Sequence, residues 1–298
     1  MSTERRNPRS VDIDLFPTER ILRIINSEDA LVAGAVGAAV PDIGKAVDLA
    51  VEAIRRDGSI IYVGAGSSGR IAALDAAEMP PTFSSPPAWV QAVIAGGSKA
   101  IVQAVEGAED DPGKAAADMK SKKVSDRDLV IGIAASGKTP YTLAALEYGK
   151  SKGAKTVAIV AVPGSPMSKV ADVTIETAVG PEIITGSTRM KAGTAQKLVL
   201  NMISTVTMIR LGMTYSNWMI NVTMTNAKLR ERGIHILCEV LGVNQNEARK
   251  LSDQSGGILK VAVVMGALRC SRKEAEQRLE RGGGNLRKVL GHLGSGRE

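Results

Sequence analysis

Residues 59–69, SIIYVGAGSSG, contain an apolar run that leads directly into a glycine-rich loop. The glycines at 64–69 have the Gly-x-Gly-x-x-Gly spacing of a dinucleotide fingerprint, which follows a strand and opens a helix. Two serines, Ser67 and Ser68, occupy the loop, and a lone glutamate, Glu78, follows within three helical turns. The stretch therefore predicts a buried strand and a helix. It leaves open whether the loop binds a nucleotide or the phosphate of a smaller molecule.

The alternation of apolar runs and helical patterns continues along the chain. Apolar runs occur within residues 59–64, 89–97, 128–136, 155–162 and 171–177. Short, continuously apolar strands separated by helices are typical of a parallel sheet that is covered on both faces. We therefore predict an α/β fold with a doubly wound, five-stranded parallel sheet.

The ends of the chain have a different pattern. We expect residues 1–57 to form a polar arm followed by three helices, with Ser27 as the N-cap of the second helix and Pro41 opening the third. Residues 58–232 would contain the sheet. Beyond them, glycine-marked turns divide residues 233–298 into short helices, which we expect to form a small helical subdomain similar to a ubiquitin-associated unit.

Composition excludes several classes of protein. The chain has 298 residues, of which 44% are hydrophobic and 23% charged, as in ordinary globular proteins. Aromatic residues make up only 3%, which disfavours stacking on single-stranded nucleic acid. Two cysteines are too few for a disulfide framework, and no Cys/His cluster has zinc spacing. We expect a cytoplasmic protein without a signal peptide, membrane span, metal or nucleic-acid partner.

A second loop resembles the first, and the pair of loops favours a phosphate group over a nucleotide as the ligand. A dinucleotide site needs an acidic residue at the end of its second strand, and residues 89–97 end without one. Residues 130–140, VIGIAASGKTP, repeat the pattern of strand, hydroxyl-bearing loop and helix start. Because the carboxyl ends of parallel strands share one edge of a sheet, the two loops should converge on one ligand.

The hydroxyls of these two loops are the predicted phosphate ligands. They belong to Ser67, Ser68, Ser136 and Thr139, and the helix starts beside them would add free N–H groups. Thr139 precedes Pro140 and is also a plausible helix cap. The alternative is that all four residues only cap helices. We predict a sugar phosphate as the ligand.

Longer blocks of sequence carry a specific resemblance. The two serine-bearing loops resemble the SIS (sugar isomerase) domain. The blocks ERRNPRSVDID, GAGSSGRIAALDAAEMPPT, AVEGAEDD and TGSTRMKAGTAQKLVLNM resemble the N-acetylmuramic acid 6-phosphate etherase family. The resemblance implies cleavage of a D-lactyl ether by elimination and hydration, without a cofactor, in a homodimer. Ser67 stands where the family often has threonine.

Two glutamates match the carboxylates of that family. The resemblance makes Glu78 the acid that protonates departing lactate, and its apolar neighbours would keep it protonated. Glu109, within an acidic cluster, would be the base at carbon 2. Without the resemblance, Glu78 could be an ordinary helix-end carboxylate and Glu109 part of a solvated turn. The acid and base roles could also be exchanged.

Residues 185–197 supply further polar groups. We expect this block to close the sugar site, with Ser187, Thr188, Arg189 and Lys191 near the phosphate or the lactyl carboxylate. The alternative is a capped helix with exposed cations.

Two other functions use the same fold. An aldose–ketose isomerase would also need a base at carbon 2 but no acid for an ether oxygen. A phosphosugar-sensing regulator would bind without turnover. Its DNA-binding form would need basic helices, which residues 31–40 do not provide.

Overall fold

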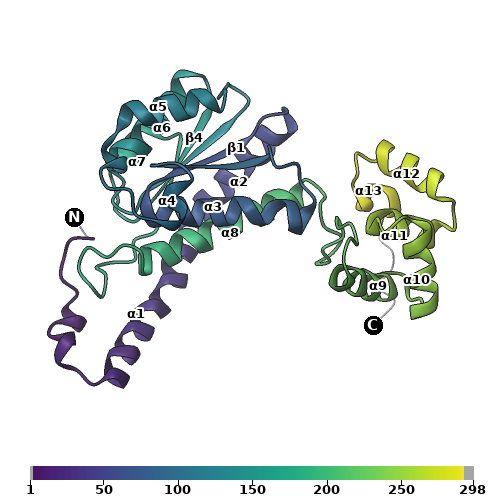
Figure 1. Cartoon of the computed structure of the whole chain (residues 1–298), viewed down its shortest axis with the longest axis horizontal. Coiled ribbons are helices and arrows are strands. Elements are labelled where there is room, and N and C mark those ends of the chain that lie inside the picture. The colour runs from purple at the N-terminus through teal and green to yellow at the C-terminus, as the bar shows by residue number, and fades with distance from the viewer. Residues whose placement is uncertain (1–2, 292–298) are drawn as a thin grey trace. The chain divides into compact units, whose positions relative to one another are not determined.

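The computed structural model describes residues 3–291, which form two compact units (Figure 1). The first unit comprises residues 1–77 and 87–205, and the second comprises residues 78–86 and 206–298, each as far as the described residues extend. The extreme ends of the expected first and last domains, residues 1–2 and 292–298, lie outside the described part of the chain.

The first unit is built on a parallel sheet. Its strands are β1 Ile60–Gly64, β2 Val90–Ile94, β3 Leu129–Ile133, β4 Lys155–Val160 and β5 Val173–Glu176. They lie in the order β2-β1-β3-β4-β5, all parallel, which confirms the predicted five-stranded α/β sheet. The order reverses between β1 and β3, and such a switch point is where open α/β sheets bind ligands.

Helices cover both faces of the sheet. On one face lie α5 Pro112–Ser121, α6 Pro140–Ser151 and α7 Pro166–Val170, whose buried side chains share a core with Val63 and Val130. On the other face, α2 Val40–Arg55 packs against β1, β3 and β5. Tyr62 also points to this face and donates a hydrogen bond of 3.2 Å to Asp75 of α3 Gly66–Phe83. The short α4 Lys99–Val102 follows β2, and α8 Lys191–Arg210 begins in the first unit, which ends within it at residue 205.

The N-terminal helices differ from the expectation. Residues 18–38 form one helix, α1 Thr18–Ala38, where two were expected. Ser27 does not cap a helix, because its hydroxyl donates to the Ile24 carbonyl within α1 at 2.8 Å. Because α2 packs on the sheet, these helices belong to the same compact unit and do not form a separate domain.

One observation concerns membranes. Within residues 3–291, no single helix is both long and apolar enough to cross a bilayer. Taken together, α1 and α2, which are bent by 60° at the break between them, have the length and the apolar composition of a membrane-spanning segment. Length and composition are the only grounds for this comparison.

The second unit consists mainly of short helices. They are α9 Ala227–Leu241, α10 Gln245–Gln254, α11 Leu259–Leu268, α12 Arg272–Arg281 and α13 Leu286–Leu290. The apolar α11 is the centre of their core, and α9, α10, α12 and α13 pack against it. The boundary expected between residues 232 and 233 falls inside α9, and residues 206–232 belong to this unit as well.

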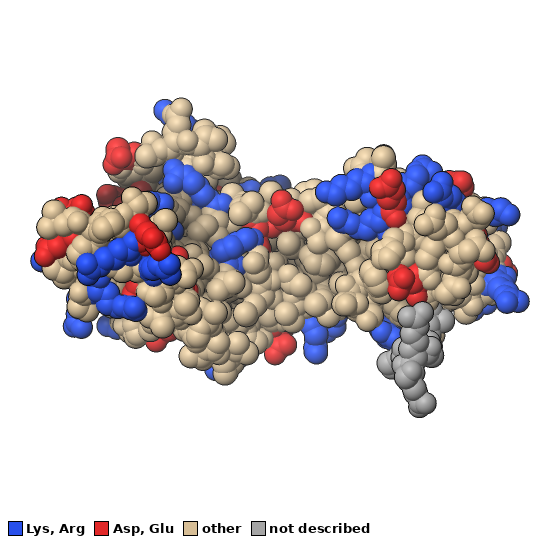
Figure 2. Space-filling model, turned by 90° about the horizontal axis from the view of Figure 1, so that it is seen from below, with Lys and Arg blue, Asp and Glu red and all other residues tan. Residues whose placement is uncertain are grey.

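Charged side chains are scattered over the surface of the second unit. On the face shown in Figure 2, lysine and arginine outnumber the acidic residues but are interspersed with them. Some form ion pairs, such as Arg230 with Asp253 and Arg272 with Glu276. This distribution is typical of solvated helix faces.

Candidate functional site

The first unit has a pocket of about 480 Å³ where β1 and β3 end. Ser67 and Ser68, from the loop after β1, line it together with Ser136 and Thr139, from the loop after β3. The structure therefore brings all four predicted phosphate ligands together. The pocket lies at the switch point of the sheet, where the sequence pattern predicted convergence.

The loop after β1 depends on close backbone packing. The backbone of Gly69 approaches β1 so closely that a Cβ on Gly69 would lie 2.8 Å from the Gly64 carbonyl oxygen. Helix α3 begins at Gly66, so Ser67 and Ser68 lie in its first turn. The backbone N–H groups of a first helical turn have no partner within the helix, and they suit an anion.

The loop after β3 is fixed by a second glycine. Gly137 has a φ of +64°, and a Cβ at this position would collide with the side chain of Ser165. Thr139 occupies the N-cap position of α6, as expected, but its side chain makes no capping hydrogen bond. Its hydroxyl therefore remains available to a ligand in the pocket. Lys138, which is exposed, adds a positive charge to the lining.

Glu109 lies in the same pocket. It belongs to the single turn η3 Ala108–Asp110, which packs against α6, and it is solvent-exposed. Asp110 also lines the pocket. The neighbouring Asp111 has a structural task, since its carboxylate accepts a 2.8 Å hydrogen bond from the Lys114 N–H and caps α5. Of this acidic cluster, Glu109 and Asp110 face the hydroxyl-bearing loops.

Glu78 is placed differently from the expectation. It is not among the residues that line this pocket, and it belongs to the second unit. There it lines a separate hollow with Asn226, Lys228 and Arg232. The expectation that its neighbours shield it from water needs correction. Glu78 is exposed, whereas Met79 and Phe83 are buried, because successive helical residues point in different directions.

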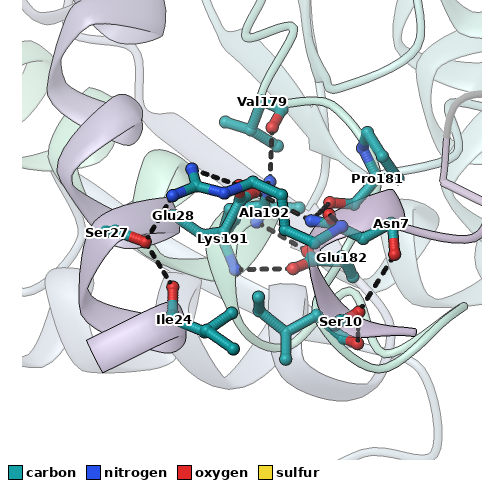
Figure 3. A network of polar contacts seen from close by, with 12 residues as sticks. Asn7, Ser10, Ile24, Ser27, Glu28, Val179, Pro181, Glu182, Lys191 and Ala192 are labelled. Carbon is teal, nitrogen blue, oxygen red and sulfur yellow. Dashed lines mark hydrogen bonds and ion pairs between the residues drawn. The ribbon is translucent and has the colours of Figure 1, made fainter. Parts of the chain in front are cut away.

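The block of residues 185–197 divides into two parts. Thr188 lines the pocket, whereas Ser187 and the exposed Arg189 flank it without lining it. Lys191 contradicts the expectation of a free cation beside the substrate. It is 1% exposed, and its ammonium is paired at 2.6 Å with Glu28 and donates at 2.9 Å to the Val179 carbonyl. Figure 3 shows this buried pair.

The sequence reading missed one wall of the pocket. Thr3 and Glu4 line it, although the first residues were read only as an irregular arm. The signal that could have indicated them is the family-like block ERRNPRSVDID, which begins at Glu4 and directly follows Thr3.

Comparison with known families first defines the class of protein. The SIS domain model matches residues 102–206, and the model of the glucokinase regulatory protein N-terminal SIS domain matches residues 42–150. Together with the parallel sheet and the pocket at its switch point, these matches identify a SIS domain.

Curated relatives then define the family. The N-acetylmuramic acid 6-phosphate etherase of Geobacillus thermodenitrificans is 48% identical over 97% of this chain and 98% of its own length. That of Edwardsiella ictaluri is 50% identical over 97% of each chain. The chain belongs to the N-acetylmuramic acid 6-phosphate etherase family. A solved phosphoheptose isomerase from Neisseria gonorrhoeae is 17% identical, covers 63% of this chain and 98% of its own, and has a TM-score of 0.49, so it adds nothing to the assignment.

Proposed function

We propose that this protein cleaves the D-lactyl ether of N-acetylmuramic acid 6-phosphate, giving N-acetylglucosamine 6-phosphate and D-lactate. The observation that carries the proposal is the near full-length identity to relatives named for this activity. The pocket supports it, since two hydroxyl-bearing loops and a carboxylate lie together at the end of the sheet.

The chemistry would proceed through the open-chain aldehyde. A base removes the proton on carbon 2, which is α to the carbonyl. The electron pair then forms a double bond between carbons 2 and 3 as the bond from carbon 3 to the lactyl oxygen breaks. That oxygen takes a proton from an acid. Water next adds to carbon 3 and a proton returns to carbon 2, so ether and water are converted to alcohol and lactate.

We assign roles by the chemistry of the residues. Ser67, Ser68, Ser136 and Thr139, with the first turns of α3 and α6, would bind the phosphate. Glu109 would be the base at carbon 2. Glu78 would be the acid for the lactyl oxygen and would later activate water. Arg189 would bind the lactyl carboxylate.

Three wider assignments accompany this function. The reaction is that of a carbon–oxygen lyase. The cysteines, Cys238 and Cys270, are both free, which suits a reducing cytoplasm. We also propose a homodimer, because Met202, Val206 and Ile209 on α8 are between 37% and 47% exposed and would be covered by a second copy.

The direct test is incubation of the purified protein with N-acetylmuramic acid 6-phosphate. We expect lactate and N-acetylglucosamine 6-phosphate in equal amounts. Release of no lactate would reject the etherase. Formation of a ketose phosphate instead would indicate an isomerase, and tight binding without turnover would indicate a sensor.

Removing hydroxyls from the second loop should weaken substrate binding. For Ser136→Ala and for Thr139→Val we expect KM to rise about tenfold, because each hydroxyl would donate to a charged phosphate. The value of kcat should change little, since the phosphate is remote from the broken bond. Steady-state kinetics measures both. Ser151→Ala is the control, because that hydroxyl only donates to the Tyr148 carbonyl within α6. Wild-type KM in both loop variants would refute this role.

A further inference from the structure

The N-terminal segment of the chain forms part of the pocket. Thr3 and Glu4 line it beside Gly186 and Thr188. The carbonyl of Thr3 accepts a hydrogen bond of 3.3 Å from the Gly186 N–H, which joins the segment to the loop before α8. The wall is therefore built from two parts of the chain that are far apart in sequence.

A polar cluster holds this segment in place, and we call it the clasp: the buried Asn7, Glu28 and Lys191 (Figure 3), together with the more exposed Arg9. The Glu28 carboxylate accepts from the Asn7 amide at 2.9 Å and from Arg9 at 3.0 Å. Lys191 donates to the same carboxylate. The arm is thus bonded to α1, and the same carboxylate joins α1 to the start of α8.

The arm is also bonded along the loop that precedes α8. Asn7 donates to the Pro181 carbonyl at 3.2 Å, and the Ser10 hydroxyl donates to the Ile183 carbonyl at 2.7 Å. These bonds lie a few residues from Thr3 and Glu4. The positions of both residues are therefore set by contacts that do not depend on a ligand.

The hydroxyl of Thr3 adds no hydrogen bond to the described part of the fold. The residue is 1% exposed, and its hydroxyl has no hydrogen-bond partner within the described part of the chain. A buried hydroxyl without a partner costs free energy. Thr3 is among the residues that line the pocket, so a polar group of a bound molecule would be the missing partner.

The carboxylate of Glu4 also has no role in holding the described residues together. It is exposed and forms no ion pair with any lysine or arginine in residues 3–291. Its Oε2 lies beside Gly186, at 3.5 Å from where a Cβ on that glycine would be. An ionised carboxylate only accepts hydrogen bonds and repels anions. It would therefore meet a neutral donor of the ligand and not its phosphate.

We propose that Thr3 and Glu4 are specificity residues that bind the neutral, hydroxyl-bearing part of the sugar, with Glu4 accepting a hydrogen bond from a sugar O–H or N–H. This inference rests on the proposed phosphosugar function of the same pocket. The hydroxyl-bearing loops hold the phosphate, and the N-terminal segment distinguishes a hexose phosphate from phosphate alone.

The variant Thr3→Val tests the hydroxyl with two readouts. Because the hydroxyl has no partner in the free protein, its removal should leave the melting temperature of the free protein unchanged or raise it. Affinity for N-acetylglucosamine 6-phosphate, measured by calorimetry, should fall about threefold to tenfold. A lowered melting temperature with unchanged affinity would show a structural hydroxyl and overturn the proposal.

The variant Glu4→Gln tests the carboxylate. We expect affinity for N-acetylglucosamine 6-phosphate to fall roughly tenfold to a hundredfold, since a hydrogen bond to a charged acceptor is lost. Affinity for inorganic phosphate should not fall. Glu19→Gln is the matched control, because that exposed glutamate pairs with Arg23 on α1. Equal affinity of wild type and Glu4→Gln for the sugar phosphate would overturn the proposal.

The two levels of inference can fail separately. These are binding measurements and need no turnover. If the wild type releases no lactate but its sugar phosphate affinity depends on Thr3 and Glu4, the etherase activity fails and the specificity residues stand. If lactate is released and both variants bind as the wild type does, only the specificity residues fail.

Discussion

Replacing Glu109 by glutamine is expected to slow lactate release by about 10²–10⁴-fold, because an amide cannot take the proton from carbon 2. The pocket should still bind N-acetylglucosamine 6-phosphate, since the loop hydroxyls are unchanged. Stopped or steady-state assays of lactate release at saturating substrate measure the loss of activity as a decrease in kcat. The matched control is Glu106→Gln, an exposed glutamate just before η3 that does not line this pocket.

Deuterium exchange at carbon 2 separates the base from the acid. In heavy water, Glu109→Gln should be slowed to a similar extent in the exchange of that hydrogen and in the release of lactate. Glu78→Gln should exchange it and release little lactate, because only protonation of the leaving oxygen is lost. The reverse pattern would exchange the two roles. Rapid turnover by Glu109→Gln would remove this residue from the mechanism.

The second large effect concerns stability. Lys191→Met should lower the free energy of unfolding by up to about 3–5 kcal/mol, because it removes the buried cation and leaves the Glu28 carboxylate with the partly exposed Arg9 as its ionic partner. The lysine and Glu28 side chains are only 1% and 6% exposed. Chemical denaturation measures the change. Lys45→Met, in an exposed pair with Asp42, is the control and should cost less than about 1 kcal/mol. Similar losses in the two variants would contradict the importance of burial.

The same pair predicts a dependence on pH. Burial raises the pKa of Glu28, but hydrogen bonds from Lys191 and Asn7 and the nearby positive charges outweigh it and hold the pKa below 4.5. A carboxyl with a lowered pKa in the folded state stabilises the fold above the unfolded value, and this stabilisation is lost as the pH falls through the folded value. The stability difference between wild type and Lys191→Met should therefore be largest where Glu28 is ionised in both proteins, and it should shrink as the pH falls toward the lowered pKa of Glu28 in folded wild type. A difference that is independent of pH down to full protonation would contradict this account.

Much of the sheet could be predicted, because the information is local. An apolar run such as residues 129–133 is buried along its whole length, and Pro140 marks where the following helix begins. The convergence of Ser67 and Ser136 followed from the rule that parallel strands end at one edge. These features depend on neighbours in sequence.

The predictions that were wrong or missing have the opposite cause, because each of these features depends on residues that are distant in sequence. Ser27 has the local form of a helix cap, but the helix continues through it and its hydroxyl also accepts from Arg9. Lys191 reads as a surface cation until its partner Glu28, 163 positions earlier, is known. For Glu78, apolar neighbours in sequence did not mean apolar surroundings in space. Thr3 gave no pattern, because one hydroxyl near the start of a chain has no periodicity.

The chain's path between its compact units limits how it can be divided. Residues 78–86 belong to the helical unit, although the sheet unit resumes at residue 87. A gene fragment that starts at residue 206 would lack Phe83, whose carbonyl accepts a hydrogen bond from Asn221. Cutting the gene at one point therefore cannot release the helical unit whole and free of the sheet unit, and a fusion partner inserted near residue 80 would disturb the helical unit despite lying early in the sequence.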